Sequence, residues 1–177
     1  KENDILIFIV NLNDYSTFNA DCLDESEKKH LEMLRTLYFK KRFIISRMVL
    51  KSILRCILNE ESSFDMSLYK DKYGRIHVND HDELNICVSY TEDALFLAIS
   101  KIELGIDAEK KRFFLLKNAS KYLQIEPSQD CSGATDQKVL KAWTLKEAYC
   151  KYSNESIFSC LNRRLDSSDI HYSTYLI

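Results

Sequence analysis

The pattern of apolar and polar positions predicts an N-terminal region with one strand, two helices and further short strands. Residues 5–10 are apolar without interruption and predict a buried strand. Apolar side chains recur at helical spacing along residues 24–39 and, more strongly, along 43–58, so each segment is expected to form an amphipathic helix. A turn at residues 73–75 then leads into a short strand at Ile76–Val78.

The rest of the chain predicts a similar succession of elements. Pro127, Gly133 and small polar residues predict a loop at residues 126–136. The other expected elements are, in chain order, strands at 84–88 and Ala94–Ser100, a strand end at 105–109, helices at 113–123 and 139–152, and strands at Ile157–Leu161 and 170–177. The order strand, helix, helix, strands thus occurs twice, which predicts an α+β fold of two pseudo-symmetric α+β halves, residues 1–100 and 101–177.

Composition and local charge narrow the class of protein. Hydrophobic residues make up 45% of the chain and charged residues 29%, as in ordinary globular proteins. The net charge of −2 hides a contrast, because residues 1–27 hold seven acids and one base whereas residues 28–55 hold nine bases and one acid. The basic segment could meet phosphates or an acidic protein, or it could be a solvated helix face.

Other features exclude several classes of site and partner. The six cysteines show no C-x-x-C pair and no zinc-site spacing, which favours reduced thiols in a cytoplasmic protein. The longest apolar run has six residues, too few to span a membrane, and no signal-peptide pattern opens the chain. Because no RNA-binding motif is present among the basic residues, we expect no nucleic-acid partner. Because the apolar runs are short, we expect no membrane partner either.

Asp107 and Glu109 are the first candidates for chemistry. Two residues apart on a strand, their carboxylates would point to the same side, next to Gly105. Converging carboxylates repel unless a cation lies between them, and hard oxygen ligands suit Mg²⁺. Two solvated acids at a strand end are the alternative interpretation of this pair.

A helix face contributes the second set of candidates. Trp143, Glu147 and Lys151 are four residues apart and share one face of the expected helix. Glu147 would supply a third carboxylate to the metal, and Lys146 and Lys151 would bind phosphate. The alternative is a buried tryptophan beside an ordinary Glu–Lys pair.

Together these segments resemble the motifs of the 4′-phosphopantetheinyl transferases. Residues 105–109 (GIDAE) are similar to the family's G-I/V-D-x-E motif, and residues 143–151 (WTLKEAYCK) to its W-S/T-x-K-E-A/S-x-x-K motif. Residues 41–47 (KRFIISR) resemble its R-R-F-x-x-x-R helix, residues 73–75 (YGR) its G-K/R-P turn, and residues 89–91 (SYT) its S-H-S/T segment. The resemblance runs from about Leu23 to the C-terminus and is closest to the long, two-half type of the family.

The resemblance implies a mechanism. Coenzyme A, the co-substrate, lies in the cleft between the halves, and Mg²⁺ or Mn²⁺ held by Asp107, Glu109 and Glu147 grips its pyrophosphate. A serine of an acyl- or peptidyl-carrier protein attacks the β-phosphate, and 3′,5′-ADP leaves. Glu147 is expected to accept the serine proton, and Lys151 to act with it in catalysis. The resemblance assigns coenzyme A binding to Arg42, Arg47, Arg75, Ser89, Tyr90, Thr91, Lys146 and Lys151.

The resemblance also implies a partner and an assembly state. The partner is a small acidic helical carrier domain, which residues 28–55 and the loop at 126–136 would approach. The enzyme is expected to be a monomer.

Two positions depart from the family pattern. Tyr90 replaces a histidine that contacts a coenzyme A phosphate, and Ile76 replaces a proline. Because tyrosine carries no positive charge at neutral pH, we expect coenzyme A to bind more weakly. A non-catalytic relative that binds coenzyme A or a carrier protein is the main alternative, and an α+β interaction domain with a chance motif match is the other.

Overall fold

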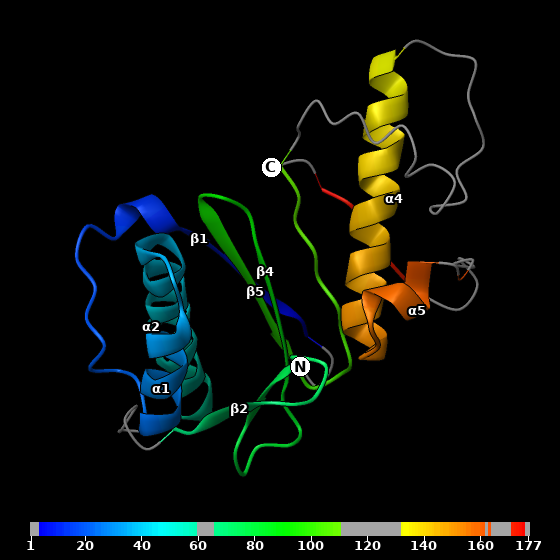
Figure 1. Cartoon of the computed structure of the whole chain (residues 1–177). Helices are drawn as coiled ribbons and strands as arrows, with labels where there is room; N and C mark the ends of the chain where they lie inside the picture. Colours follow the sequence, from blue (N-terminus) through cyan, green and yellow to red (C-terminus); the bar gives the residue numbers. More distant parts are fainter. Residues whose placement is uncertain (1–3, 60–65, 111–131, 162, 164–170, 176–177) are drawn as a thin grey trace.

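The chain folds into a mixed α+β structure around one antiparallel sheet (Figure 1). The computed structural model describes residues 4–59, 66–110, 132–161, 163 and 171–175. The five strands lie in the order β1-β5-β4-β3-β2, and all of the pairings are antiparallel. The elements are β1 (Leu6–Asn11), η1 (Leu12–Asp14), α1 (Glu25–Met33), α2 (Leu37–Leu58), β2 (Leu68–Lys70), β3 (Ile76–Val78), β4 (Asn85–Tyr90), β5 (Ala94–Ser100), α4 (Ser132–Ser153) and α5 (Ile157–Leu161).

Helices α1 and α2 are separated by a short extended connection. The side chain of Thr36 caps α2 by accepting a hydrogen bond from the backbone N–H of Phe39, and Leu34 ends α1 with extended backbone angles. A threonine cap satisfies an N–H group that a continuous helix would bond internally, so the chain starts a new helix here. The prediction of one helix over residues 24–39 is therefore wrong, and α2 includes both the end of that segment and the whole of the predicted 43–58 helix.

One face of the sheet packs against α2. Figure 1 shows α1 and α2 on this side of the strands. The buried side chains of Leu50 and Leu54 on α2 meet Leu97 and Ile99 on β5, within a larger apolar cluster. Each such leucine contributes roughly 1.5–3 kcal/mol through its burial, so this layer fixes how the sheet lies on α2.

The opposite face of the sheet is covered by residues 101–110 and then by α4 (Figure 1). Cys87 of β4 and Ala98 of β5 are buried there against Leu104. At Gly105 an added Cβ would lie 2.0 Å from the carbonyl oxygen of Ala148, so only a glycine lets this segment approach α4 so closely.

Several predicted elements differ in the structure. Residues 105–109 are not part of a strand, because the segment packs between β4 and α4 without forming a backbone ladder. Residues 132–136, predicted as loop, begin α4. Ile157–Leu161 is a helix, since the Ser156 hydroxyl accepts a bond from the N–H of Ser159 at its start and a short apolar run does not distinguish helix from strand.

The remaining predictions concern other strands and the elements expected in residues 101–177. Strand β2 was not predicted, and residues 171–175 of the predicted final strand have no strand structure. The predicted helix at 113–123 and the loop residues 126–131 lie outside the described residues. The α+β class is confirmed, and the described residues after Ser100 form α4 and α5 without a strand. Within the part that the structure describes, no helix has the length and hydropathy to cross a membrane.

Candidate metal centre

Three predicted carboxylates meet between the sheet and α4. Asp107 and Glu109 come from the segment after β5, and Glu147 comes from the middle of α4. One oxygen of each carboxylate lies within 4.8 Å of the other two. Oxygens this close can share one hydrated divalent ion of the magnesium type.

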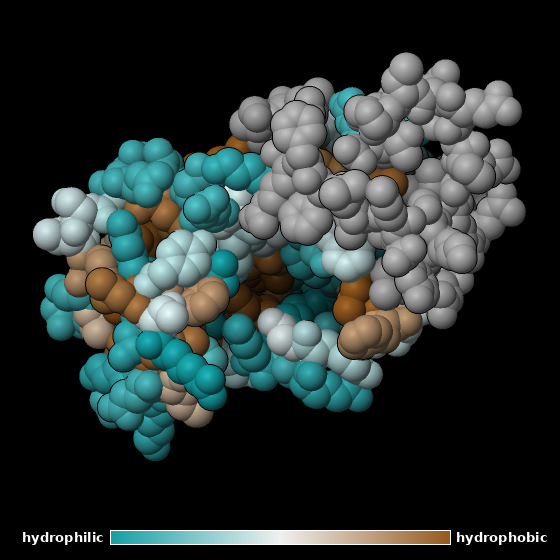
Figure 2. All heavy atoms as spheres, turned by 45° about the horizontal axis from the view of Figure 1, so that its top comes forward, coloured by the Kyte–Doolittle hydropathy of each residue, from teal (hydrophilic) through white to brown (hydrophobic). Residues whose placement is uncertain are grey.

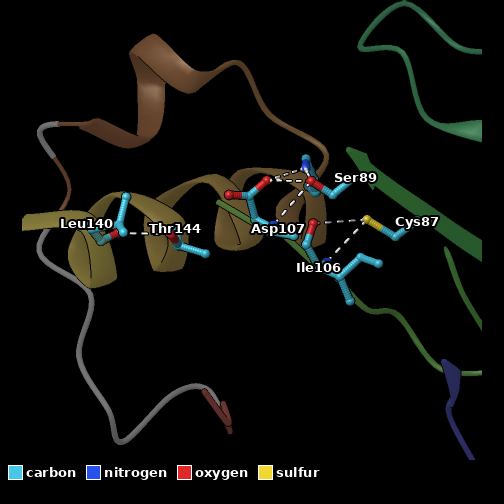
Figure 3. Close-up of polar contacts among 8 residues, drawn as sticks. Cys87, Ser89, Ile106, Asp107, Leu140 and Thr144 are labelled. Carbon is cyan, nitrogen blue, oxygen red and sulfur yellow. Dashed lines mark hydrogen bonds and ion pairs between the residues drawn. The ribbon is translucent and has the colours of Figure 1, made fainter. Parts of the chain in front are cut away.

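Alternate residues of β4 hold the segment that carries Asp107 (Figure 3). The Ser89 hydroxyl donates to Asp107 Oδ1 at 2.8 Å and accepts from the backbone N–H of Ala108 at 3.2 Å. The N–H of Ile106 lies 3.2 Å from Cys87 Sγ. Because residues two apart on a strand point to the same side, Cys87 and Ser89 together replace the missing backbone ladder.

Lys151 joins the cluster one helical turn after Glu147. Its Nζ lies 2.7 Å from Asp107 Oδ1 and 3.1 Å from Ser89 Oγ. The Asp107 side chain is only 3% exposed, whereas that of Lys151 is 31% exposed. The lysine therefore neutralises one oxygen of a buried aspartate and keeps a path to solvent.

The surroundings of the second oxygen of Asp107 show whether a cation fits among the three carboxylates. Asp107 Oδ2 is buried and receives no hydrogen bond from the described residues. A buried charged oxygen without a partner is costly, and either a proton on Glu147 or a bound cation would remove that cost. The donor set of three carboxylates fits Mg²⁺ or Mn²⁺ and contains no soft ligand.

The pKa of Glu147 is shifted by its position in this cluster. Burial, followed by the negative charge of Asp107, raises the pKa of the Glu147 carboxyl to about 7, while Lys151 acts in the opposite direction. Both burial and the neighbouring carboxylate of Asp107 thus disfavour the charged form of Glu147 in the metal-free protein.

Two of the predicted coenzyme A ligands are used elsewhere. Arg47 is buried on α2, where its Nε lies 3.0 Å from Glu27 Oε1, and Lys51 Nζ lies 2.7 Å from the other oxygen of that carboxylate. The contact between Arg47 Nε and Glu27 Oε1 is an ion pair and not a well-directed hydrogen bond, because neither atom has a hydrogen-bond partner. Arg75 donates from its guanidinium to the carbonyl oxygens of Lys151 and Tyr152 at the end of α4.

Lys146 and Thr91 also have local partners. Lys146 is buried and donates to the carbonyl oxygen of Arg163 at 3.1 Å, and burial lowers the pKa of its ammonium. The Thr91 hydroxyl accepts from the N–H of Ala94 and donates to Asp93, so it shapes the turn between β4 and β5.

Arg42 and Tyr90 form a pair on the α2 side of the sheet. The Arg42 guanidinium lies 4.4 Å from the centre of the Tyr90 ring, which packs with the apolar cluster around Ile45 and Leu95. Ser89 and Tyr90 are adjacent on β4, so they point to opposite faces, and only Ser89 reaches the acidic cluster.

The sequence analysis missed the supporting role of β4. Cys87 and Ser89 hold the backbone and carboxylate of residues 105–109, the metal segment, and Lys151 pairs directly with Asp107. Their spacing of two residues was the available signal, but the predicted strand at 84–88 contained only Cys87 and ended one residue before Ser89.

The chain was compared with models of known protein families and with curated proteins, and neither comparison gives a match.

Proposed function

We propose that this chain is a 4′-phosphopantetheinyl transferase. It moves the phosphopantetheine arm of coenzyme A to a serine of an acyl- or peptidyl-carrier protein and releases 3′,5′-ADP, with Mg²⁺ or Mn²⁺ bound. The observation that carries the proposal is the convergence of Asp107, Glu109 and Glu147 within 4.8 Å, from two segments far apart in the sequence. These are the three positions that the sequence resemblance assigns to the metal.

The organisation of the chain around the cluster supports a substrate site there. In this proposal residues 1–100 and 101–177 are the two pseudo-symmetric halves of the family, with the cluster at their junction. Figure 2 shows the surface hollowed between the side of the molecule with α1 and α2 and the side with α4. A diphosphate entering from solvent would meet the exposed carboxylate of Glu109 and the partly exposed ammonium of Lys151.

The cation and the protein divide the chemistry. When bound by Asp107, Glu109 and Glu147, a divalent ion would neutralise charge on the diphosphate of coenzyme A. Glu147 accepts the proton of the carrier serine as its oxygen bonds to the β-phosphorus. The bond from that phosphorus to the bridging oxygen breaks, and 3′,5′-ADP leaves with the electron pair. Lys151 supplies positive charge to a phosphate oxygen beside Asp107.

In this proposal Arg42 supplies the positive charge that is lost where Tyr90 replaces the family histidine. The family histidine is replaced by an uncharged ring, but the guanidinium of Arg42 lies directly over that ring. We infer that Arg42, which lies on the α2 side of the sheet and outside the acidic cluster, provides a cation for the part of coenzyme A that extends away from the metal, beside the turn that Thr91 shapes.

Location, assembly and partner complete the proposal. The free thiols of Cys87, Cys150 and Cys160 fit a reducing compartment, and we infer a cytoplasmic monomer. Apart from Arg47 and Lys51, which are buried against Glu27, the basic residues of 28–55 offer a charge-complementary surface to an acidic carrier domain.

A carrier-modification assay tests the function. The protein is incubated with Mg²⁺, coenzyme A and a panel of apo-carrier domains, and each carrier is weighed by mass spectrometry. Addition of the phosphopantetheine arm, lost without metal and in Asp107→Asn, is the expected result. Binding of coenzyme A without transfer to any carrier would favour the non-catalytic relative, and neither binding nor transfer would leave only a chance motif match.

A further inference from the structure

The C-terminal end of α4 has an ending that requires outside partners. Asn154 follows the helix in the left-handed conformation, with φ of 52°, and the N–H of Glu155 donates to the carbonyl oxygen of Cys150 at 3.0 Å. This is the hydrogen bond of a Schellman ending, which still leaves later carbonyl groups of the last turn to be satisfied.

Arg75 from the β2–β3 hairpin supplies those donors. Its Nη2 donates to the carbonyl oxygen of Tyr152 at 2.8 Å and to that of Lys151. A cation at the C-terminal end of a helix is also favoured by the helix dipole. A residue far away in the sequence thereby completes the end of the helix that carries Glu147 and Lys151.

Asp71 of the same hairpin connects Arg75 with Asn154. Asp71 Oδ1 accepts from the backbone N–H groups of Tyr73 at 2.9 Å and Arg75 at 3.0 Å, which shapes the turn. Asp71 Oδ2 accepts from Asn154 Nδ2 at 2.6 Å. Burial pushes the pKa of Asp71 upward, but hydrogen bonds from Asn154, from His77 and from the two backbone groups lower this pKa to about 2. The carboxylate is therefore ionised at physiological pH.

We propose that Asp71, Arg75 and Asn154 form a latch that positions the last turns of α4 over the metal segment. The latch holds the backbone of Lys151, and the ammonium of the same residue holds Asp107 at 2.7 Å. A released helix end would let Lys151 and Glu147 move away from Asp107. The three latch residues are positioning residues for the cluster, and this consequence rests on the proposed function.

The latch gives Arg75 a different role from the one that the family resemblance implies. A phosphate-binding arginine would contribute to the affinity for coenzyme A, whereas a positioning arginine contributes to metal affinity and turnover. Loss of the latch should therefore lower kcat and leave the KM for coenzyme A unchanged.

Two variants release the latch from opposite sides. Asn154→Gly keeps the left-handed helix ending, which glycine favours, and removes only the amide that reaches Asp71. Arg75→Met removes the two hydrogen bonds to α4 and keeps most of the side-chain bulk. Lys101→Met, at an exposed position just after β5, is the control, since it removes a surface cation outside the latch and outside residues 28–55.

Hydrogen exchange and Mn²⁺ titration of the full chain report on the helix end and on the metal, and the carrier-modification assay gives kcat and the KM for coenzyme A. Amides of residues 148–153 are expected to exchange at least about tenfold faster in both variants, because the helix end opens more often. The Kd for Mn²⁺ is expected to rise roughly 10- to 100-fold, as for other residues that support metal ligands. The control should match the wild type in both measurements.

The outcomes separate the latch from the function. Unchanged exchange in both variants would overturn the latch. Faster exchange with an unchanged Kd, or a higher KM for coenzyme A with unchanged kcat, would overturn the positioning role. If the wild type binds no Mn²⁺, the proposed function and the positioning role both fail, and the exchange rates alone then decide whether the latch exists.

Discussion

Gly105→Ala tests most sharply how the metal segment is seated on α4. The added Cβ would lie 2.0 Å from the carbonyl oxygen of Ala148 and 2.5 Å from the backbone nitrogen of Tyr152. Both atoms belong to the helix backbone, which cannot rotate away as a flexible side chain can. Either α4 or the segment must therefore move, and with it the distance between Glu147 and Asp107 must change.

The magnitude follows from the size of the overlap. Inserting one methyl group into a packed region costs typically about 1–3 kcal/mol, and a clash with rigid backbone belongs at the upper end of that range or beyond it. We expect a loss of about 3 kcal/mol in the free energy of unfolding, measured by urea denaturation, together with weaker Mn²⁺ binding.

Gly74→Ala is the matched control for stability. Gly74 has a φ of +92° but no atom within 4 Å of an added Cβ, so this substitution adds backbone strain without a clash. It should cost about 1 kcal/mol. The seating of α4 on Gly105 would be refuted if Gly105→Ala changed the unfolding free energy no more than this control and left Mn²⁺ affinity unchanged.

Three further predictions follow from the charges. Stabilisation by Mg²⁺, measured by thermal unfolding, should be larger at pH 8 than at pH 5.5. Because the pKa of Glu147 is raised to about 7, its carboxyl is protonated at pH 5.5 and competes poorly as a metal ligand. The stability that this proton gives to the metal-free fold is lost as the pH rises through about 7, where the bound ion takes over. An equal Mg²⁺ effect at both pH values would contradict this. Glu27→Gln leaves Arg47 and Lys51 buried without a counter-charge and should cost about 3–5 kcal/mol in urea unfolding; a loss below about 1 kcal/mol would show that the triad is not coupled. Arg42→Met should raise the KM for coenzyme A about tenfold with little change in kcat, and an unchanged KM would remove Arg42 from the substrate site.

The N-terminal elements were the most predictable part of the fold. Long segments with regular periodicity, such as residues 43–58, identified α2 because an amphipathic pattern of this length fits only a helix. The break before Leu37 was missed because it depends on one hydroxyl cap at Thr36. Ile157–Leu161 was misassigned because five residues contain too little periodicity to distinguish helix from strand.

In the candidate site, too, some residues could be predicted from the sequence and others could not. The acids at 107, 109 and 147 could be grouped from local spacing and the family resemblance, and the structure places them together. The partners of Arg47, Arg75 and Lys146 could not be predicted, because each depends on residues brought close only by the tertiary fold. A basic residue in a motif therefore did not reveal whether its charge faces a substrate or the end of a helix.

The central claim is that Asp107, Glu109 and Glu147 hold one divalent cation. Mn²⁺ binding, measured by electron paramagnetic resonance with and without coenzyme A, tests it most directly in the wild type and in Asp107→Asn, Glu109→Gln and Glu147→Gln. One ion per chain, bound more tightly with coenzyme A and more weakly in each variant, is the predicted result. No bound ion in the wild type, or equal binding in all three variants, would contradict the account.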